Sequence, residues 1–145
     1  MNRFEGGCHC GNLRFIFTTA LPIEALVPRA CDCSFCRKHD ARALSDPAGR
    51  LEITVADADA LIRYRFGTGF TDFLICRRCG VYIGAFMPNG DAAYANVMVN
   101  AFDAPGTITR APVTVRRSTE DALTKRRRRR ANWTPATLSS GRPAV

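Results

Sequence analysis

Three groups of closely spaced cysteines constrain the fold of this chain more than any other feature. All seven cysteines fall into these groups, which are a CxC pair (Cys8, Cys10), a CxCxxC triple (Cys31, Cys33, Cys36) and a CxxC pair (Cys76, Cys79). An odd number of cysteines argues against a closed framework of disulfides. Burial of isolated thiols as small apolar side chains does not produce three tight clusters. The spacing therefore predicts metal binding.

Zinc is the metal that this pattern favours, because it binds thiolates in tetrahedral geometry. Cys76 and Cys79 precede Gly80, which permits a tight turn behind the metal, as in half of a zinc ribbon. The partner pair is either Cys8 and Cys10 or two cysteines of the middle triple. Seven thiols divide into four and three, which suggests one closed structural site and one open site with room for a substrate.

The length and composition are those of one globular domain. The chain has 145 residues, of which 46% are hydrophobic and 23% are charged. No apolar run approaches the ~20 residues of a membrane span, and the first residues lack the apolar core of a signal peptide. We therefore expect a cytoplasmic protein without a membrane partner.

The net charge of +8 comes largely from one run of six cations, from Lys125 to Arg130, and the rest of the chain carries only +2. Such a run is either a solvated basic segment or a contact for nucleic acid or another anionic surface. No basic stripe interleaved with aromatic residues supports nucleic-acid binding. We interpret the run as a solvated segment.

Alternating apolar residues predict short strands through most of the chain. The expected strands cover residues 12–17, 51–55, 61–66, 73–75, 81–87, 95–99 and 113–115, and the fourth and fifth form a hairpin that carries Cys76 and Cys79 at its tip. A short helix is expected within 35–43, and Ser118 to Asp121 can cap another. Residues beyond Trp133 are expected to form a loose tail. The prediction is a mainly β zinc domain with short helices over 1–117, followed by a basic, partly loose segment over 118–145.

Three segments carry a resemblance to a known family. GGCHCGNLRF (6–15), CDCSFCR (31–37) and CRRCG (76–80) resemble the glutathione-dependent formaldehyde-activating enzyme family in order, spacing and glycines. The resemblance extends from about Gly6 to Asp103 and includes ANVMVN (95–100). It implies a β-tent fold, a barrel-like or sandwich-like arrangement shared with a Rab-binding chaperone, and two zinc sites.

The family also implies which cysteines share a zinc ion. By position, the four cysteines of the closed structural site are Cys8, Cys10, Cys76 and Cys79. The three cysteines of the open catalytic site are Cys31, Cys33 and Cys36. We expect the three-thiolate site to hold its ion less firmly, so that it can be empty without substrate.

The family's reaction makes and breaks a carbon–sulfur bond, since glutathione adds reversibly to formaldehyde and gives S-hydroxymethylglutathione. The resemblance therefore implies a zinc-dependent carbon–sulfur lyase whose substrates are an aldehyde and glutathione or another small thiol. Three thiolates leave a zinc centre with a net charge of −1, which favours binding of the substrate thiol over activation of the carbonyl. The alternative is a non-catalytic, zinc-stabilised protein-binding or chaperone-like module. The cysteine triple favours the enzyme.

Charged neighbours of the cysteines have two readings each. His39, three residues after Cys36, is a candidate fourth ligand or general base if a helical turn begins at Cys36, although a role outside the metal site is the simpler interpretation. Four cations flank the clusters: Arg37, Lys38, Arg77 and Arg78. They compensate the charge of the thiolates or, alternatively, recognise the carboxylates of glutathione.

Overall fold

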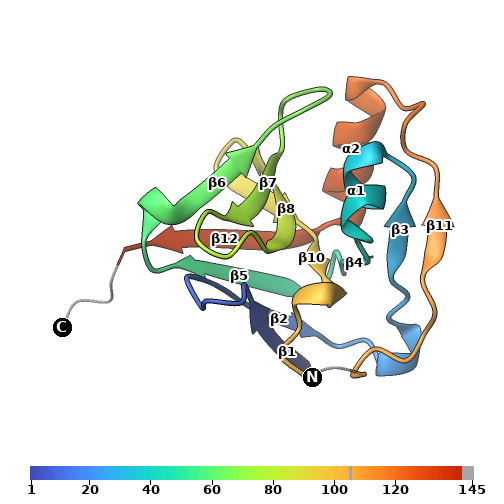
Figure 1. Cartoon of the computed structure of the whole chain (residues 1–145). Coiled ribbons are helices and arrows are strands. Elements are labelled where there is room, and N and C mark those ends of the chain that lie inside the picture. Colours follow the sequence, from blue (N-terminus) through green and yellow to red (C-terminus); the bar gives the residue numbers. More distant parts are fainter. Residues whose placement is uncertain (105, 142–145) are drawn as a thin grey trace.

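Two β-sheets organise the structure, a computed structural model that describes residues 1–104 and 106–141 (Figure 1). The larger sheet has eight strands in the spatial order β1 (Asn2–Gly7), β2 (Leu13–Thr19), β5 (Arg50–Val55), β12 (Thr134–Ser140), β9 (Ala92–Ala95), β8 (Tyr82–Asn89), β7 (Asp72–Cys76) and β6 (Leu61–Tyr64). Neighbouring strands are antiparallel except for β5 and β12, which are parallel. The predicted mainly β fold is confirmed.

The second sheet is smaller, with four strands. Its order is β10 (Val97–Met98), β4 (Ala43–Leu44), β3 (Arg29–Cys31) and β11 (Val113–Val115). The helix α1 (Ser34–His39) lies beside β3 in Figure 1, and α2 (Ala122–Asn132) contacts β9 of the larger sheet. Three single turns of 3-10 helix complete the elements: η1 (Ile23–Ala25), η2 (Ala58–Ala60) and η3 (Val99–Ala101). None of the described helices has the length and apolarity needed to span a membrane.

The core forms where the alternating strands face inward, as the sequence predicts. Leu13, Phe15 and Phe17 of β2 are at most 2% exposed, whereas the residues between them are half-buried. Phe15 pairs in register with Ile53 of β5, which alternates in the same way. Each such side chain stabilises the fold by about 1.5–3 kcal/mol when it leaves water.

The predicted hairpin around Cys76 is also present. β7 and β8 are antiparallel, and the Cys76 N–H donates to the carbonyl of Val81 across the turn. Gly80 adopts a φ of +79° and donates its N–H to the carbonyl of Cys76 at 2.8 Å. Glycine occupies this left-handed conformation without the steric cost of a side chain.

Other predicted boundaries shift. The helix expected within 35–43 ends at His39, because Asp40 takes the left-handed conformation with a φ of +48°. The strand expected at 95–99 is divided between the two sheets at Asn96. There the side-chain oxygen of Asn96 accepts the Ala85 N–H at 2.8 Å. Strand β1, which lies before the first cysteine pair and pairs with β2, was not predicted.

The prediction of a loose tail beyond Trp133 is wrong for Thr134–Ser140. These residues form β12, which lies between β5 and β9 in the larger sheet. Trp133 and Thr134 are buried, and the Thr134 hydroxyl accepts the Asp46 N–H at 2.8 Å. Small polar residues suit this strand because most of its outward-facing side chains are exposed. Residues 142–145 of the predicted tail lie outside the described residues.

Candidate metal centres and the adjoining cavity

The two cysteine pairs meet in one four-thiol cluster. The Cys10 sulfur lies 3.7 Å from that of Cys8 and 3.5 Å from that of Cys76, and the sulfurs of all four residues, with Cys79, lie within 4.8 Å of one another. Sulfurs bound to one tetrahedral zinc at about 2.3 Å are separated by about 3.8 Å. The four thiols therefore have the spacing of a closed metal site.

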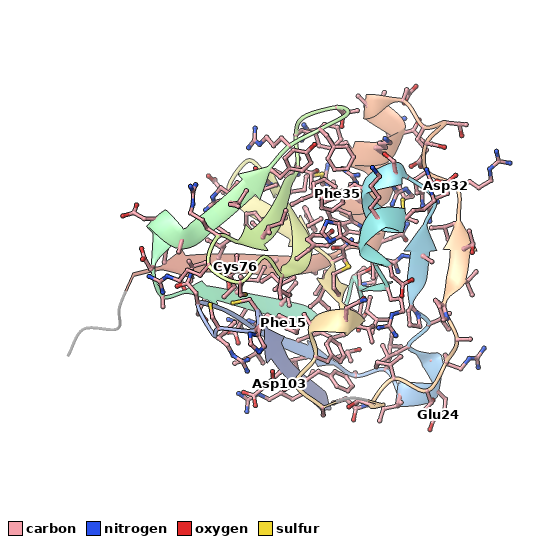
Figure 2. All side chains as sticks on the ribbon, viewed as in Figure 1. Phe15, Glu24, Asp32, Phe35, Cys76 and Asp103 are labelled. Carbon is pink, nitrogen blue, oxygen red and sulfur yellow. The ribbon has the colours of Figure 1, made fainter. Side chains whose placement is uncertain are left out.

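Backbone hydrogen bonds fix this cluster from two turns. In the β1–β2 turn, the Cys8 N–H donates to the Leu13 carbonyl at 2.9 Å and the Leu13 N–H donates to the Cys8 sulfur at 3.2 Å. The second turn is the Gly80 turn of the β7–β8 hairpin. Figure 2 shows Cys76 in the large sheet, where it is fully buried. The cluster thus connects two strand pairs that are distant in the sequence.

Burial opposes ionisation of the first cluster. It raises the pKa of the Cys8 thiol to about 12, and hydrogen bonds to neighbouring cysteines add to this effect. Burial also raises the pKa of Cys79, but N–H donors from the backbone and the adjacent thiols outweigh it and lower this pKa to about 6. Four thiolates at this separation need a shared cation to offset their repulsion. A soft divalent metal ion satisfies that need.

The three remaining cysteines form a second cluster where β3 leads into α1. Cys31 ends β3, and Cys33 is the N-cap of α1, where its sulfur accepts the Cys36 N–H at 3.4 Å. The three sulfurs lie within 4.8 Å of one another, and all three residues are half-buried. The structure thus places the seven cysteines in a group of four and a group of three.

The second cluster also resists full ionisation. Hydrogen bonds from the thiols of Cys31 and Cys36 lower the pKa of Cys33 to about 2. Hydrogen bonding to Cys31 and Cys33, together with burial, raises the pKa of Cys36. One thiolate is therefore stabilised at the expense of its neighbours, and ionisation of all three requires a cation. Three soft donors fit a metal ion that keeps one position open.

A cavity of about 80 Å³ adjoins this second cluster. Its aromatic wall includes Phe66, Phe73 and Tyr82, whose rings surround Phe35 of α1 at centroid distances of 5.0–5.2 Å. Figure 2 shows Phe35 on α1, away from Cys76 and the first cluster. All three cysteines of the triple line the cavity. The four-thiol cluster does not contribute to it within the described residues.

Five cations also line the cavity, and sequence analysis did not identify them as part of the site. They are Arg29, Arg117, Lys125, Arg128 and Arg129. The last three belong to the basic run of α2, at positions i, i+3 and i+4, and therefore share one face of the helix. All three are half-buried, whereas Arg127 and Arg130 are exposed. The helical spacing of Lys125, Arg128 and Arg129 was the signal that could have identified these three cations. The interpretation of the whole basic run as solvated is therefore wrong for this face of α2.

The cations that are next to the cysteines in the sequence do not line the cavity in the described structure. Arg37 donates to the backbone carbonyl of Asp32 at 3.1 Å, and Arg78 forms an ion pair with Asp57. None of Arg37, Lys38, Arg77 and Arg78 is among the described residues that line the cavity. Their placement gives no support to carboxylate recognition by these four residues.

His39 is not part of the metal-binding geometry of the triple. Its exposed ring packs against Phe35 at a centroid distance of 4.5 Å and against Tyr82 at 5.4 Å. Among the described residues, the ligand atoms grouped at this cluster are the three cysteine sulfurs alone. The structure therefore does not bring His39 to the cysteines as a fourth ligand.

Comparison with known proteins places most of the chain in one family. A family model described as glutathione-dependent formaldehyde-activating enzyme matches residues 3–117. A solved structure of a protein from Rhodobacter sphaeroides, a structural genomics target, is 29% identical in sequence, with a TM-score of 0.56. That match covers 77% of this chain and 99% of the Rhodobacter sphaeroides chain. The family match includes all seven cysteines and ends before α2.

Proposed function

The chain belongs to the glutathione-dependent formaldehyde-activating enzyme family, and we propose that it is a zinc-dependent carbon–sulfur lyase of β-tent fold. It adds a small thiol to an aldehyde and reverses that addition, with glutathione and formaldehyde as the first candidates. The observation that supports catalysis most directly is the opening of the Cys31, Cys33 and Cys36 cluster into a cavity.

Each cysteine cluster has a separate role in this proposal. Cys8, Cys10, Cys76 and Cys79 hold a structural zinc that joins the β1–β2 and β7–β8 turns. Cys31, Cys33 and Cys36 hold a second zinc with an open position. When bound there, zinc stabilises a thiolate near neutral pH and so supplies the nucleophile.

The reaction is an addition in which nothing is oxidised. The thiol sulfur forms a bond to the carbonyl carbon, the carbonyl π bond breaks, and the proton of the thiol ends on the former carbonyl oxygen. Tyr82 lines the cavity, and burial raises its pKa well above the usual value for a phenol. Its hydroxyl therefore stays protonated and can donate a hydrogen bond to the developing alkoxide. Phe73 and Met98 form apolar parts of the wall that limit access of water.

Exchange NMR on a mixture of glutathione and formaldehyde tests the proposal. The spontaneous reaction gives the baseline, and zinc-loaded protein is expected to accelerate exchange between the free thiol and its adduct. Cys33→Ser should abolish this acceleration while circular dichroism shows an unchanged fold. The control for catalysis by free metal is the same total zinc without protein, and Cys33→Ser is compared at the same protein concentration.

The absence of acceleration by fully zinc-loaded protein would rule out glutathione–formaldehyde chemistry for this chain. Equal acceleration by the Cys33→Ser variant would remove the open cluster as its location. A protein that accelerates no thiol–aldehyde exchange, and keeps its fold without the second metal ion, would support the protein-binding module instead.

A further inference from the structure

One wall of the cavity carries a concentration of positive charge without matching acidic groups. Its five cations come from β3, from the segment after β11 and from α2. Within residues 1–104 and 106–141, no aspartate or glutamate side chain lines the cavity. Three thiolates with one divalent ion carry a net charge of only −1, so the wall retains an excess of positive charge.

Two of these cations, Arg29 and Arg129, are half-buried and have neutral partners. Arg29 donates to the Ser45 hydroxyl at 2.7 Å, and Arg129 donates to the Thr71 hydroxyl at 2.7 Å. The Nε atom of Arg129 is buried and has no hydrogen-bond partner among the described residues. Burial, together with the charge of neighbouring arginines, lowers the pKa of each guanidinium to about 10. Buried cations are ordinarily paired with a carboxylate, whereas the direct side-chain partners of these two within the described residues are hydroxyls.

Arg128 of the same wall, in contrast, has a carboxylate partner. Its guanidinium makes hydrogen bonds of 2.9–3.0 Å to both carboxylate oxygens of Glu120, and both side chains are largely buried. This carboxylate is engaged by Arg128 and lies outside the cavity lining. Glu120 also acts at longer range on Arg117, Lys125 and Arg129, but within the described residues it forms its ion pair with Arg128 and not with these three cations.

Aromatic contacts hold Arg129 in position. Its guanidinium carbon lies 4.8 Å from the ring centroid of Trp133 and 5.4 Å from that of Phe70. Cation–π contacts of this kind stabilise a guanidinium and limit its motion. A cation held in place beside a cavity binds an anion with less loss of side-chain entropy than a mobile one.

We propose that Arg29, Arg117 and Arg129 form a carboxylate-binding subsite, which restricts this enzyme to thiols that carry an acidic group. The inference rests on the proposed function, because it locates the charged end of the thiol substrate beside the three-cysteine cluster. Arg129 lies beyond residues 3–117 and so outside the family match. The subsite is therefore partly built by the segment that follows the family region.

Binding of a thioether tests the subsite without turnover, because a thioether has no thiol to add to an aldehyde. The probe is S-methylglutathione, titrated into zinc-loaded protein by isothermal calorimetry, with its dimethyl ester as the uncharged comparison. Arg129→Gln should weaken binding of the acid about tenfold or more, since it removes charge-assisted hydrogen bonds to the carboxylate. Arg127→Gln is the matched control, because Arg127 is exposed on the same helix, and it should leave binding unchanged.

A second variant keeps the test independent of any effect of Arg129 on folding. Arg29→Gln, on β3, should weaken binding by a similar factor, and Arg129→Lys should retain more affinity than Arg129→Gln. The subsite is overturned if S-methylglutathione does not bind, if the dimethyl ester binds as tightly as the acid, or if Arg129→Gln behaves as Arg127→Gln does. If S-methylglutathione binds as expected but the protein does not accelerate thiol–aldehyde exchange, the proposed function is rejected and the carboxylate-binding subsite is retained.

Discussion

The sulfurs of Cys10 and Cys76 lie 3.5 Å apart although 66 positions separate the two residues in the sequence. This contact joins the β1–β2 turn to the tip of the β7–β8 hairpin. Binding of a metal ion at this cluster therefore closes a long loop of the chain. In small domains, the free energy of such binding appears as folding free energy.

The two cysteine clusters should contribute differently to stability. Cys79→Ser is expected to abolish cooperative thermal unfolding, because structural zinc contributes about 10 kcal/mol or more in small domains. Cys33→Ser should keep a cooperative transition and lose one of two zinc ions per chain. Circular dichroism melts and metal analysis by mass spectrometry measure both effects. Equal loss of melting temperature in the two variants would contradict the division of roles.

Replacement of His39 should leave metal binding at the triple unchanged. Its ring packs on Phe35 and is exposed, and it is not grouped with the three sulfurs. His39→Ala is therefore expected to bind cobalt with the same affinity and the same visible spectrum as the unmodified chain. A changed ligand-field spectrum in this variant would show that His39 coordinates the ion.

The ion pair of Glu120 and Arg128 predicts a pH-dependent part of the stability. Burial raises the pKa of Glu120, but its hydrogen bonds to Arg128 outweigh burial and lower the pKa below its ordinary value of 4.5. The unfolded chain therefore binds a proton more readily than the folded one. The stabilisation is fully present above pH 4.5 and is lost as the pH falls through the lower, folded pKa.

Glu120→Gln should reduce the free energy of unfolding by about 2 kcal/mol at pH 7. The difference from the unmodified chain should shrink as the pH falls below 4.5. Denaturant titrations between pH 7 and pH 3 measure it. Glu24→Gln is the control, since Glu24 is exposed at the surface in Figure 2 and forms no ion pair within the described residues. A difference between Glu120→Gln and the unmodified chain that does not vary with pH would refute the assignment.

Removal of β12 should prevent stable folding. A chain that ends at Asn132 lacks Trp133 and the strand that separates β5 from β9. Its loss exposes unpaired backbone on both neighbouring strands, which favours aggregation. Size-exclusion chromatography and circular dichroism of the truncated chain check this expectation. A monomer with the melting temperature of the full chain would show that β12 is dispensable.

The sequence predicted the local features of this fold better than its long-range pairing. Alternation identified β2 and β5 because Leu13, Phe15 and Phe17 occupy one buried face. The same test missed β12, in which polar and small residues predominate and pairing with β5 and β9 decides the conformation. Strand pairing over such distances leaves little trace in local composition.

The sequence predicted the cysteines of the candidate site but not the cations that line the cavity. Close spacing marked all seven cysteines as candidate metal ligands, and the resemblance to the family supplied the grouping that spacing alone left open. Arg29 and Arg117 carry no such signal, because only the folded chain brings β3, β11 and α2 to one cavity. The basic run gave no amphipathic pattern that would separate buried from exposed cations, since both faces of α2 are basic.

The position of β12 also determines when the large sheet can form during synthesis. The strands β1, β2 and β5 on one side, and β6 to β9 on the other, leave the ribosome before Thr134–Ser140 exists. Until β12 is made, the edges of β5 and β9 that it joins have no partner strand between them. Cys8, Cys10, Cys76 and Cys79 precede that strand in the sequence, so a metal ion bound by them would join the two halves before the final strand inserts between them.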